Sequence, residues 1–393
     1  MDNIVNEKDK CCGCGLCAIK CPKNAIEMRE DEFGFVYPYI NQDKCINCGI
    51  CKKVCAYNND SVENKFEKKV YGAVSKDDKI LNSTASGGVF TSIATEFIKQ
   101  NGVVFGCSLE KENNKFIVKH IKVDNLDDLE KLKGSKYVQS DITNIFKEIK
   151  DCLKDNKKVL FSGTPCQVAA IKKFTNNPDN LFTIDIICHG VPSNKMFNDY
   201  IEYENKKKNI IIEDFKFRDK SKGWGLNYSY IFGNKKIVKP SFKSSYYQLF
   251  LDSKIYRENC YSCPYANENR ISDITIGDYW GIEKEHPELT NKIDFLKGVS
   301  CIIVNTEKGL KMIDSYNQNL TKYNSNFEKV KMHNNQLNKP SHINNDRNII
   351  LDKYKKYGFK EVNNYYWKKS LIKIAIKNIY YKITNNIKER IKK

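Results

Sequence analysis

The sequence predicts a small cysteine-rich α+β domain at the N-terminus, a larger α/β domain with a partly parallel sheet, and a basic amphipathic C-terminal helix. Nine of the 16 cysteines lie in the first 57 residues, in two similar units offset by 34 residues. After residue 70, apolar stretches of strand length alternate with helical patterns. The last 43 residues contain 13 Lys and Arg against three Asp and Glu. We therefore divide the chain into residues 1–57, a linker at 58–69, a domain at 70–310, and a helical, basic extension at 311–393.

Length and composition limit the classes of function. A chain of 393 residues, 40% of them hydrophobic, can form two or three domains with buried cores, which excludes wholesale disorder. The formal charge of +18 favours contact with nucleic acid, an anionic membrane surface or an acidic partner, but without a nucleic-acid reading module we expect no nucleic acid. The first residues contain no apolar signal region, and no stretch reaches 18 apolar residues. We therefore expect a cytoplasmic protein that does not span a membrane.

The elements of the larger domain follow from its periodicity. Strands are expected at residues 70–75, 103–109, 116–123, 159–162, 182–188, 213–218, 228–232, 273–279 and 299–305, and helices at 89–100, 167–174 and 246–259. Strand, helix and strand in succession across residues 159–188 imply a parallel pair with a right-handed crossover. Isoleucines at helical spacing within residues 365–393 predict a tail helix that rests on an anionic membrane surface, docks an acidic partner, or packs on its own domain.

The two N-terminal cysteine runs have the same spacing, C-x2-C-x2-C-x3-C. They comprise Cys11, Cys14, Cys17 and Cys21, followed by Cys45, Cys48, Cys51 and Cys55. Three thiolates on a tight loop bind three corners of a 4Fe-4S cluster while the fourth reaches the other cluster, so Cys55 completes the first cluster and Cys21 the second. Zinc is the alternative metal, but zinc motifs place two ligand pairs further apart. Cys12 is left over, either as a packing residue or as a rival of Cys11.

Four later cysteines predict a third metal site. Cys166 follows one strand and Cys188 follows the next parallel strand, so both fall at the carboxyl edge of one sheet, where α/β folds build their sites. Cys260 and Cys263 supply a C-x2-C pair on a polar loop, and the four together are enough for a third 4Fe-4S cluster. The alternative for Cys166 and Cys188 is that each packs as a small buried hydrophobe.

Two family resemblances follow from these motifs. Residues 6–57 resemble a bacterial-type two-cluster ferredoxin domain, although Ala56 stands where the second unit usually has Pro. The larger region is similar to the coenzyme F-420 hydrogenase/dehydrogenase beta-subunit family through five ordered motifs, at residues 86–91, 134–140, 163–167, 188–192 and 277–281. The resemblances imply a ferredoxin-like first domain, a non-covalently bound flavin, expected to be FAD, and a 4Fe-4S cluster beside it. By motif, the ligands of that cluster carry over to Cys166, Cys188, Cys260 and Cys263.

The flavin site needs a phosphate cradle, because no dinucleotide-binding or P-loop motif occurs in the sequence. Ser86, Gly87 and Gly88 open the expected helix at 89–100 and offer N–H groups and a helix dipole to a pyrophosphate. Lys136 is expected to stabilise a flavin anion or a phosphate, with Tyr137 stacking, and His189 to hydrogen-bond the cluster or the flavin. The alternatives are an ordinary helix cap, a solvated loop and a structural histidine. Asp278 and Trp280 are motif residues without an assigned role.

The inventory indicates an enzyme, a flavin- and iron–sulfur-dependent oxidoreductase. A flavin exchanges two electrons as hydride and clusters pass one electron at a time, so a flavin converts between the two kinds of transfer. We expect the flavin to exchange hydride with coenzyme F-420 or another soluble carrier. The alternative is an electron-transfer subunit that has no substrate of its own and docks on a catalytic redox partner. A third class, a zinc-stabilised interaction protein, predicts a colourless preparation.

Overall fold

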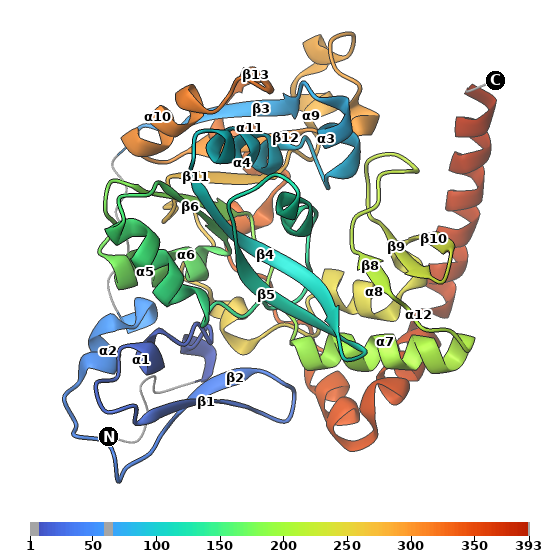
Figure 1. Ribbon diagram of the computed structural model, residues 1–393. Coiled ribbons are helices and arrows are strands. Elements are labelled where there is room, and N and C mark those ends of the chain that lie inside the picture. The colour runs from blue at the N-terminus through green and yellow to red at the C-terminus, as the bar shows by residue number, and fades with distance from the viewer. Residues whose placement is uncertain (1–7, 59–65, 392–393) are drawn as a thin grey trace.

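The N-terminal unit is a hairpin with two short helices. The computed structural model describes residues 8–58 and 66–391 (Figure 1). Strands β1 (Ile26–Glu30) and β2 (Val36–Ile40) pair antiparallel, and helices α1 (Leu16–Ile19) and α2 (Ile50–Val54) follow the two cysteine loops. Each helix begins after a left-handed glycine, Gly15 at φ 76° and Gly49 at φ 73°, a conformation that costs glycine little. The small α+β unit predicted from the sequence is confirmed.

The larger domain is built on an eight-stranded mixed sheet with the order β13-β3-β12-β11-β7-β6-β4-β5. The strands are β3 (Lys69–Ser75), β4 (Val103–Glu112), β5 (Lys115–Val123), β6 (Val159–Gly163), β7 (Leu181–Ile186), β11 (Ile274–Asp278), β12 (Ser300–Val304) and β13 (Leu320–Ser325). The four neighbours β11, β7, β6 and β4 are parallel, and the flanking pairs are antiparallel. The partly parallel sheet predicted from the sequence is confirmed, and the carboxyl ends of its parallel strands meet at one edge.

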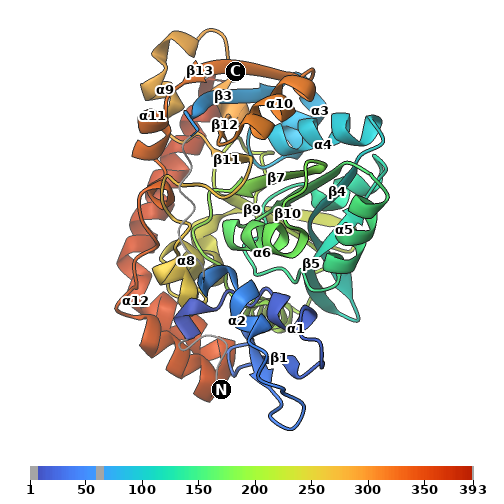
Figure 2. The same cartoon turned by 90° about the vertical axis from the view of Figure 1, so that its left-hand side faces the viewer.

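Helices cover both faces of the sheet. They are α3 (Asp78–Ser83), α4 (Val89–Lys99), α5 (Ile145–Lys154), α6 (Pro165–Thr175), α9 (Ile282–Glu285), α10 (Glu307–Ser315) and α11 (Phe327–Met332). Along β4, Val104 packs with α4 and α10 on one face, whereas Val103 and Phe105 pack with α5 and α6 on the other. This alternation is the two-residue period of a strand buried on both sides. The N-terminal unit lies beneath α5 and α6, at the end opposite β3 and β13 (Figures 1 and 2).

A second layer flanks the sheet (Figure 1). It contains the three-stranded sheet β8 (Asp214–Lys216), β9 (Asn227–Phe232) and β10 (Lys235–Pro240), with helices α7 (Asn194–Lys208), α8 (Ser245–Leu251) and α12 (Arg347–Ile391). Its core is rich in aromatic rings, such as Phe197, Tyr246 and Phe359. In α12 the helix is interrupted at Gly358, where φ is 71°.

Three boundaries differ from the expectations. The helix expected at 246–259 ends at Leu251, because Ser253 is left-handed at φ 55°, and a separate 3-10 turn, η5, spans Glu258–Ser262. The sheet extends past residue 310, since β13 pairs with β3. The tail helix starts at Arg347, well before residue 365.

The first half of α12 packs on the rest of the second layer through residues such as Ile350 and Tyr354. Further along the helix, Leu371, Ile376 and Ile379 are exposed. Among the described residues, no helix is both long and apolar enough to cross a membrane.

Candidate functional site: a cysteine-lined cavity

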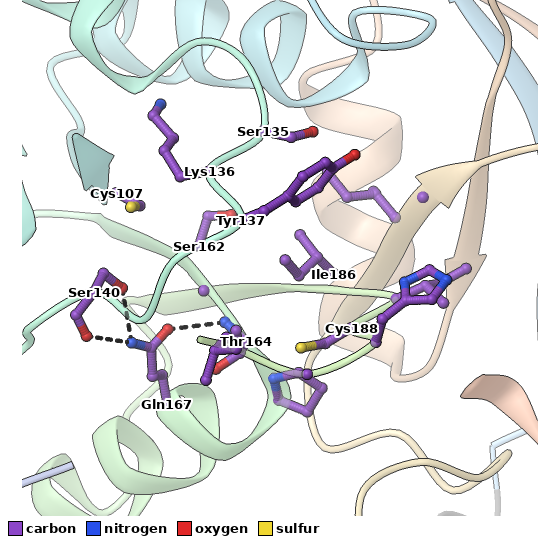
Figure 3. A pocket seen from close by; sticks show the side chains of 18 of the residues that line it. Cys107, Ser135, Lys136, Tyr137, Ser140, Ser162, Thr164, Gln167, Ile186 and Cys188 are labelled. Atoms are coloured by element: carbon purple, nitrogen blue, oxygen red, sulfur yellow. Dashed lines mark hydrogen bonds between the residues drawn. The ribbon is translucent and has the colours of Figure 1, made fainter. Parts of the chain in front are cut away.

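A cavity of about 310 Å³ opens at the carboxyl edge of the parallel strands. It is lined by the residues that follow β6 and β7, by the last three residues of β11, by the loop at 134–140 and by the start of α4. Figure 3 shows the Cys188 sulfur on the side toward Thr164, which precedes α6, with Ile186 above it in this view. The volume is within the range of cofactor and ligand sites in proteins.

The four later cysteines all line this one cavity. Cys166 lies in the first turn of α6, Cys188 follows β7, and Cys260 and Cys263 lie in and just after η5. Burial raises the pKa of the Cys188 thiol to about 12 and that of Cys263 to about 11, and it also raises the pKa of Cys260. Four thiols converging on a cavity from three segments are a donor set that fits an iron–sulfur cluster, whose positive iron favours the thiolate form.

Cys166 differs from the other three thiols. Hydrogen bonding from the Cys12 thiol is the largest cause that lowers the pKa of Cys166 to about 7, and the Thr164 hydroxyl, 3.2 Å from its Sγ atom, adds to the effect. Cys12 itself is buried, lines the cavity and also interacts with Cys14. The cysteine left over by sequence reasoning is therefore a residue of the N-terminal unit that reaches the cavity.

The eight N-terminal cysteines lie in two surroundings. Cys14 packs partly against the core shared with α5 and α6, whereas Cys17, Cys21, Cys45 and Cys51 pack around Ile26 and Ile40 of the hairpin. The second run, Cys45 to Cys55, is called the outer run below; its Cys45, Cys48 and Cys51 line a small separate hollow with Cys21, and Cys48 is exposed. Across residues 8–58 and 66–391, no group of three or more His, Cys, Asp or Glu side chains is spaced for a single metal ion.

The start of α4 is the clearest anion cradle in the cavity. Gly88 precedes the helix at φ 82°, no side chain caps this end, and residues 88–91 line the cavity. The first N–H groups of a helix have no partner within it, so they suit a phosphate. Gly87 has another role, because a Cβ atom there would lie 2.2 Å from the Ala73 carbonyl oxygen of β3. Ser86 donates its hydroxyl hydrogen to the Val299 carbonyl at 2.9 Å, which holds the loop in place.

The other three predicted flavin contacts also line the cavity. Lys136 donates to the carbonyls of Lys131 and Lys133, at 3.2 and 2.8 Å, and burial lowers its pKa to about 8. Tyr137 has one face covered by Phe250, at 4.4 Å between ring centroids and 10° between planes. Desolvation at the cavity wall lowers the pKa of His189.

Gln167 ties the two sides of the cavity together. Its side-chain amide donates to the carbonyl and the hydroxyl of Ser140, at 3.1 and 2.9 Å, and its amide oxygen accepts from the Thr164 N–H at 3.0 Å (Figure 3). Thr164 and Gln167 form a capping box at the start of α6. This arrangement fixes the loop that carries Lys136 and Tyr137 relative to Cys166.

Sequence reasoning missed a cluster around Asp278. Arg218 donates to both carboxylate oxygens of Asp278, at 2.7 and 3.3 Å, and the Trp224 indole N–H donates to it at 2.9 Å. The rings of Trp224 and Trp280 stack at 4.6 Å. Arg218 and Lys220 also donate to the carbonyls of residues 85 and 86, so this cluster fastens the loop that begins α4. The hydrophobic pattern of residues 218–224 gives no sign of this cluster. Its contacts are with β11 and with the loop at residues 85–86, which are distant in the sequence.

Comparisons with known proteins agree with the two halves of this picture. Residues 10–59 match the model of a 4Fe-4S dicluster domain, and residues 156–327 match that of the C-terminus of the coenzyme F420 hydrogenase/dehydrogenase beta subunit. No curated protein matches the chain. Among solved structures, one similar chain comes from the F420-reducing [NiFe] hydrogenase complex of Methanosarcina barkeri, with 17% identity over 77% of this chain and 92% of that chain and a TM-score of 0.46.

The dicluster match covers both N-terminal cysteine runs. The beta-subunit match includes Cys166, Cys188, Cys260 and Cys263. The chain therefore carries a 4Fe-4S dicluster domain at residues 10–59 and, at residues 156–327, the C-terminal domain of the coenzyme F420 hydrogenase/dehydrogenase beta subunit.

Proposed function

We propose that this chain is an iron–sulfur flavoprotein oxidoreductase that carries electrons between its N-terminal clusters and a flavin bound in the cysteine-lined cavity. The observation that carries the proposal is the convergence of Cys166, Cys188, Cys260 and Cys263 on a cavity that the uncapped start of α4 also lines. The thiols would hold a third 4Fe-4S cluster, and the helix start would bind the flavin pyrophosphate.

A bound flavin supplies the exchange between two-electron hydride transfer and one-electron transfer to iron–sulfur clusters. The protein's own residues would bind and orient the flavin. Arg218 and Lys220 hold the loop before α4, Gln167 holds the loop with Lys136 against α6, and the aromatic pair Tyr137 and Phe250 lines the cavity. Cys12 and Cys14 bring the first cysteine run, Cys11 to Cys21 and called the inner run below, next to Cys166, which supports a route between the dicluster domain and the cavity.

The natural hydride carrier is proposed to be coenzyme F420 or another soluble carrier. The second candidate is an electron-transfer subunit without its own substrate, and the exposed Cys48 favours it, since an exposed outer run suits contact with a redox partner. Turnover separates the two candidates. If the isolated, reduced chain reduces F420 or a nicotinamide, it is an enzyme by itself. A chain that holds flavin but reduces neither carrier is the docking subunit.

Metal and flavin content test the site directly. Protein purified without oxygen is expected to contain about twelve irons and one flavin, because three 4Fe-4S clusters need that iron. Cys263→Ser should lower the iron to about eight. Cys152→Ser is the matched control, because Cys152 is buried in the core against α6 and does not line the cavity. Unchanged iron in Cys263→Ser, or about eight irons and no flavin in the parent protein, would overturn the cavity assignment.

A further inference from the structure

Arg257 is a fully buried arginine at the contact between the N-terminal unit and the cavity. It is 0% exposed. Its guanidinium donates to the carbonyls of Cys11 and Val36 at 2.6 and 2.8 Å, to the side-chain oxygen of Gln139 at 3.4 Å, and to the Sγ atom of Cys11 at 3.6 Å. Its backbone N–H donates to the Val191 carbonyl at 2.9 Å. One side chain thus joins the first cysteine loop to two loops of the larger domain.

The charge of Arg257 has no carboxylate partner among the described residues. The two other most deeply buried arginines are paired: Arg218 with Asp278 at 2.7 Å and Arg270 with Asp185 at 3.0 Å. Arg257 instead makes hydrogen bonds to neutral oxygens and lies over the Tyr37 ring, 4.1 Å from its centroid. Burying an unpaired cation costs several kcal/mol or more, so a buried guanidinium calls for a negative group nearby.

The negative groups at hand are cysteine sulfurs. Arg257 contacts the Sγ atom of Cys11 at 3.6 Å and lines the same cavity as Cys12 and Cys260, and the Cys260 N–H donates to the Arg257 carbonyl at 3.0 Å. Cys11 opens the inner N-terminal run, and Cys260 opens the C-x2-C pair of the cavity. Arg257 therefore lies between two predicted cluster sites. Thiolates that bind iron at either site would supply the negative charge that carboxylates supply to Arg218 and Arg270.

We infer that Arg257 is the shared counter-cation of the cluster held through Cys11 and the cluster held through Cys260, and that it sets both reduction potentials. The inference rests on the iron–sulfur assignment above. One-electron reduction adds a negative charge to a cluster, and a buried cation with a hydrogen bond to a ligating sulfur stabilises that added charge. Arg257 thus raises the potentials of the inner cluster and the cavity cluster relative to that of the outer cluster.

Gly13 is part of the same arrangement. A Cβ atom at Gly13 would lie 3.0 Å from an Nη atom of Arg257 and 2.8 Å from the Val36 carbonyl oxygen, and φ is 68°. Only glycine leaves room for the guanidinium to reach the Cys11 loop. Any side chain at this position would push the cation away from the cluster ligands.

The test is a redox titration of the iron-loaded protein, followed by electron paramagnetic resonance. In Arg257→Gln, we expect the reduction equilibrium constants of the inner and cavity clusters to fall about tenfold or more, which is 59 mV for one electron. The outer cluster should keep its potential. Arg257→Lys keeps a charge but loses the fork of donors, so its shift should have the same sign and be smaller. Arg347→Gln is the control, because Arg347 contacts the Tyr256 carbonyl and the Tyr261 ring.

The outcomes separate this inference from the proposed function. Full iron in Arg257→Gln with all potentials unchanged would overturn the role of Arg257 and leave the clusters standing. Parent protein without the cavity iron would overturn the proposed function itself. If Arg257→Gln does not load iron, Arg257→Lys decides: a selective downward shift supports the role, and unchanged potentials reject it.

Discussion

The two cysteine runs have the same spacing and share the apolar contact around Ile26 and Ile40, but they differ in what lies around Cys14 and Cys48. Cys14 of the inner run packs against the core with α5 and α6, and Arg257 reaches Cys11 from the larger domain. In the outer run Cys48 is exposed, and the neighbouring Ile46 and Ile50 are 57% and 36% exposed. The spacing of the cysteines decides which metal group can be bound. Tertiary contacts decide the charge environment of that group and its exposure to other molecules. The inner run thus borders the core of the larger domain at Cys14, whereas the outer run is exposed at Cys48.

The largest expected effect comes from removing one ligand of each run. Cys14→Ser and Cys48→Ser should each lose about four irons, the content of one cluster. Only Cys14→Ser should also lower the thermal stability of the larger domain, because Cys14 packs into its core. Iron analysis and calorimetry check both statements. Equal losses of stability in the two variants would mean that the two runs are not packed differently.

A smaller effect is expected from charge reversal around the outer run. Lys23, Lys44 and Lys53 are exposed there, near the apolar side chains of Ile46 and Ile50. Changing the three to Glu should slow reduction by an acidic ferredoxin about tenfold at low salt, and the difference should shrink at high salt. Reduction by methyl viologen, a small mediator, should not slow.

The control variant carries Lys235→Glu, Lys292→Glu and Lys311→Glu, three exposed lysines of the larger domain with the same total change of charge. Stopped-flow rates with the acidic ferredoxin should stay near those of the parent. If both triple variants slow reduction equally, the overall charge of the protein matters rather than the outer run.

The smallest effect concerns Gly15 and Gly49, the left-handed glycines that precede α1 and α2. A Cβ atom at Gly15 would lie 2.4 Å from the Cγ2 atom of Thr143 in the larger domain, whereas nothing lies within 4 Å of one at Gly49. Gly49→Ala should cost only the left-handed strain, about 1–2 kcal/mol of unfolding free energy. Gly15→Ala should cost about 1–3 kcal/mol more because of overpacking.

Thr143→Ser gives this comparison an internal check. It removes the Cγ2 atom while retaining a hydroxyl for the 2.8 Å hydrogen bond to Asp141. Combined with Gly15→Ala, it should restore most of the extra loss, and combined with Gly49→Ala it should restore nothing. Denaturant unfolding of Thr143→Ser, the two glycine variants and the two double variants measures the coupling, and an additive result at Gly15 would show that Thr143 is not the obstacle.

The spacing of the cysteines and the order of the strands were the most informative features of the sequence. Cys166 and Cys188 each follow a parallel strand, so their shared edge could be deduced from topology alone. Arg257 could not be found in this way, because its meaning lies in contacts with Cys11, more than 200 positions away. The role of Cys12 depends likewise on Cys166, and the early end of α8 depends on the single left-handed residue Ser253. Periodicity records which face is buried and does not record which distant loop covers it.

The position of β3 bears on how the protein is made. This strand is the first of the large sheet in the sequence, but its neighbours are β12 and β13, about 230 to 250 residues later. At 5–20 residues per second, a ribosome needs roughly 10 to 50 s to supply them. During that interval the complete N-terminal unit is already outside the ribosome with all of its cysteines, while the larger domain lacks the strands that close its sheet. Iron delivered during synthesis therefore meets the two N-terminal runs first, and the cavity cysteines last.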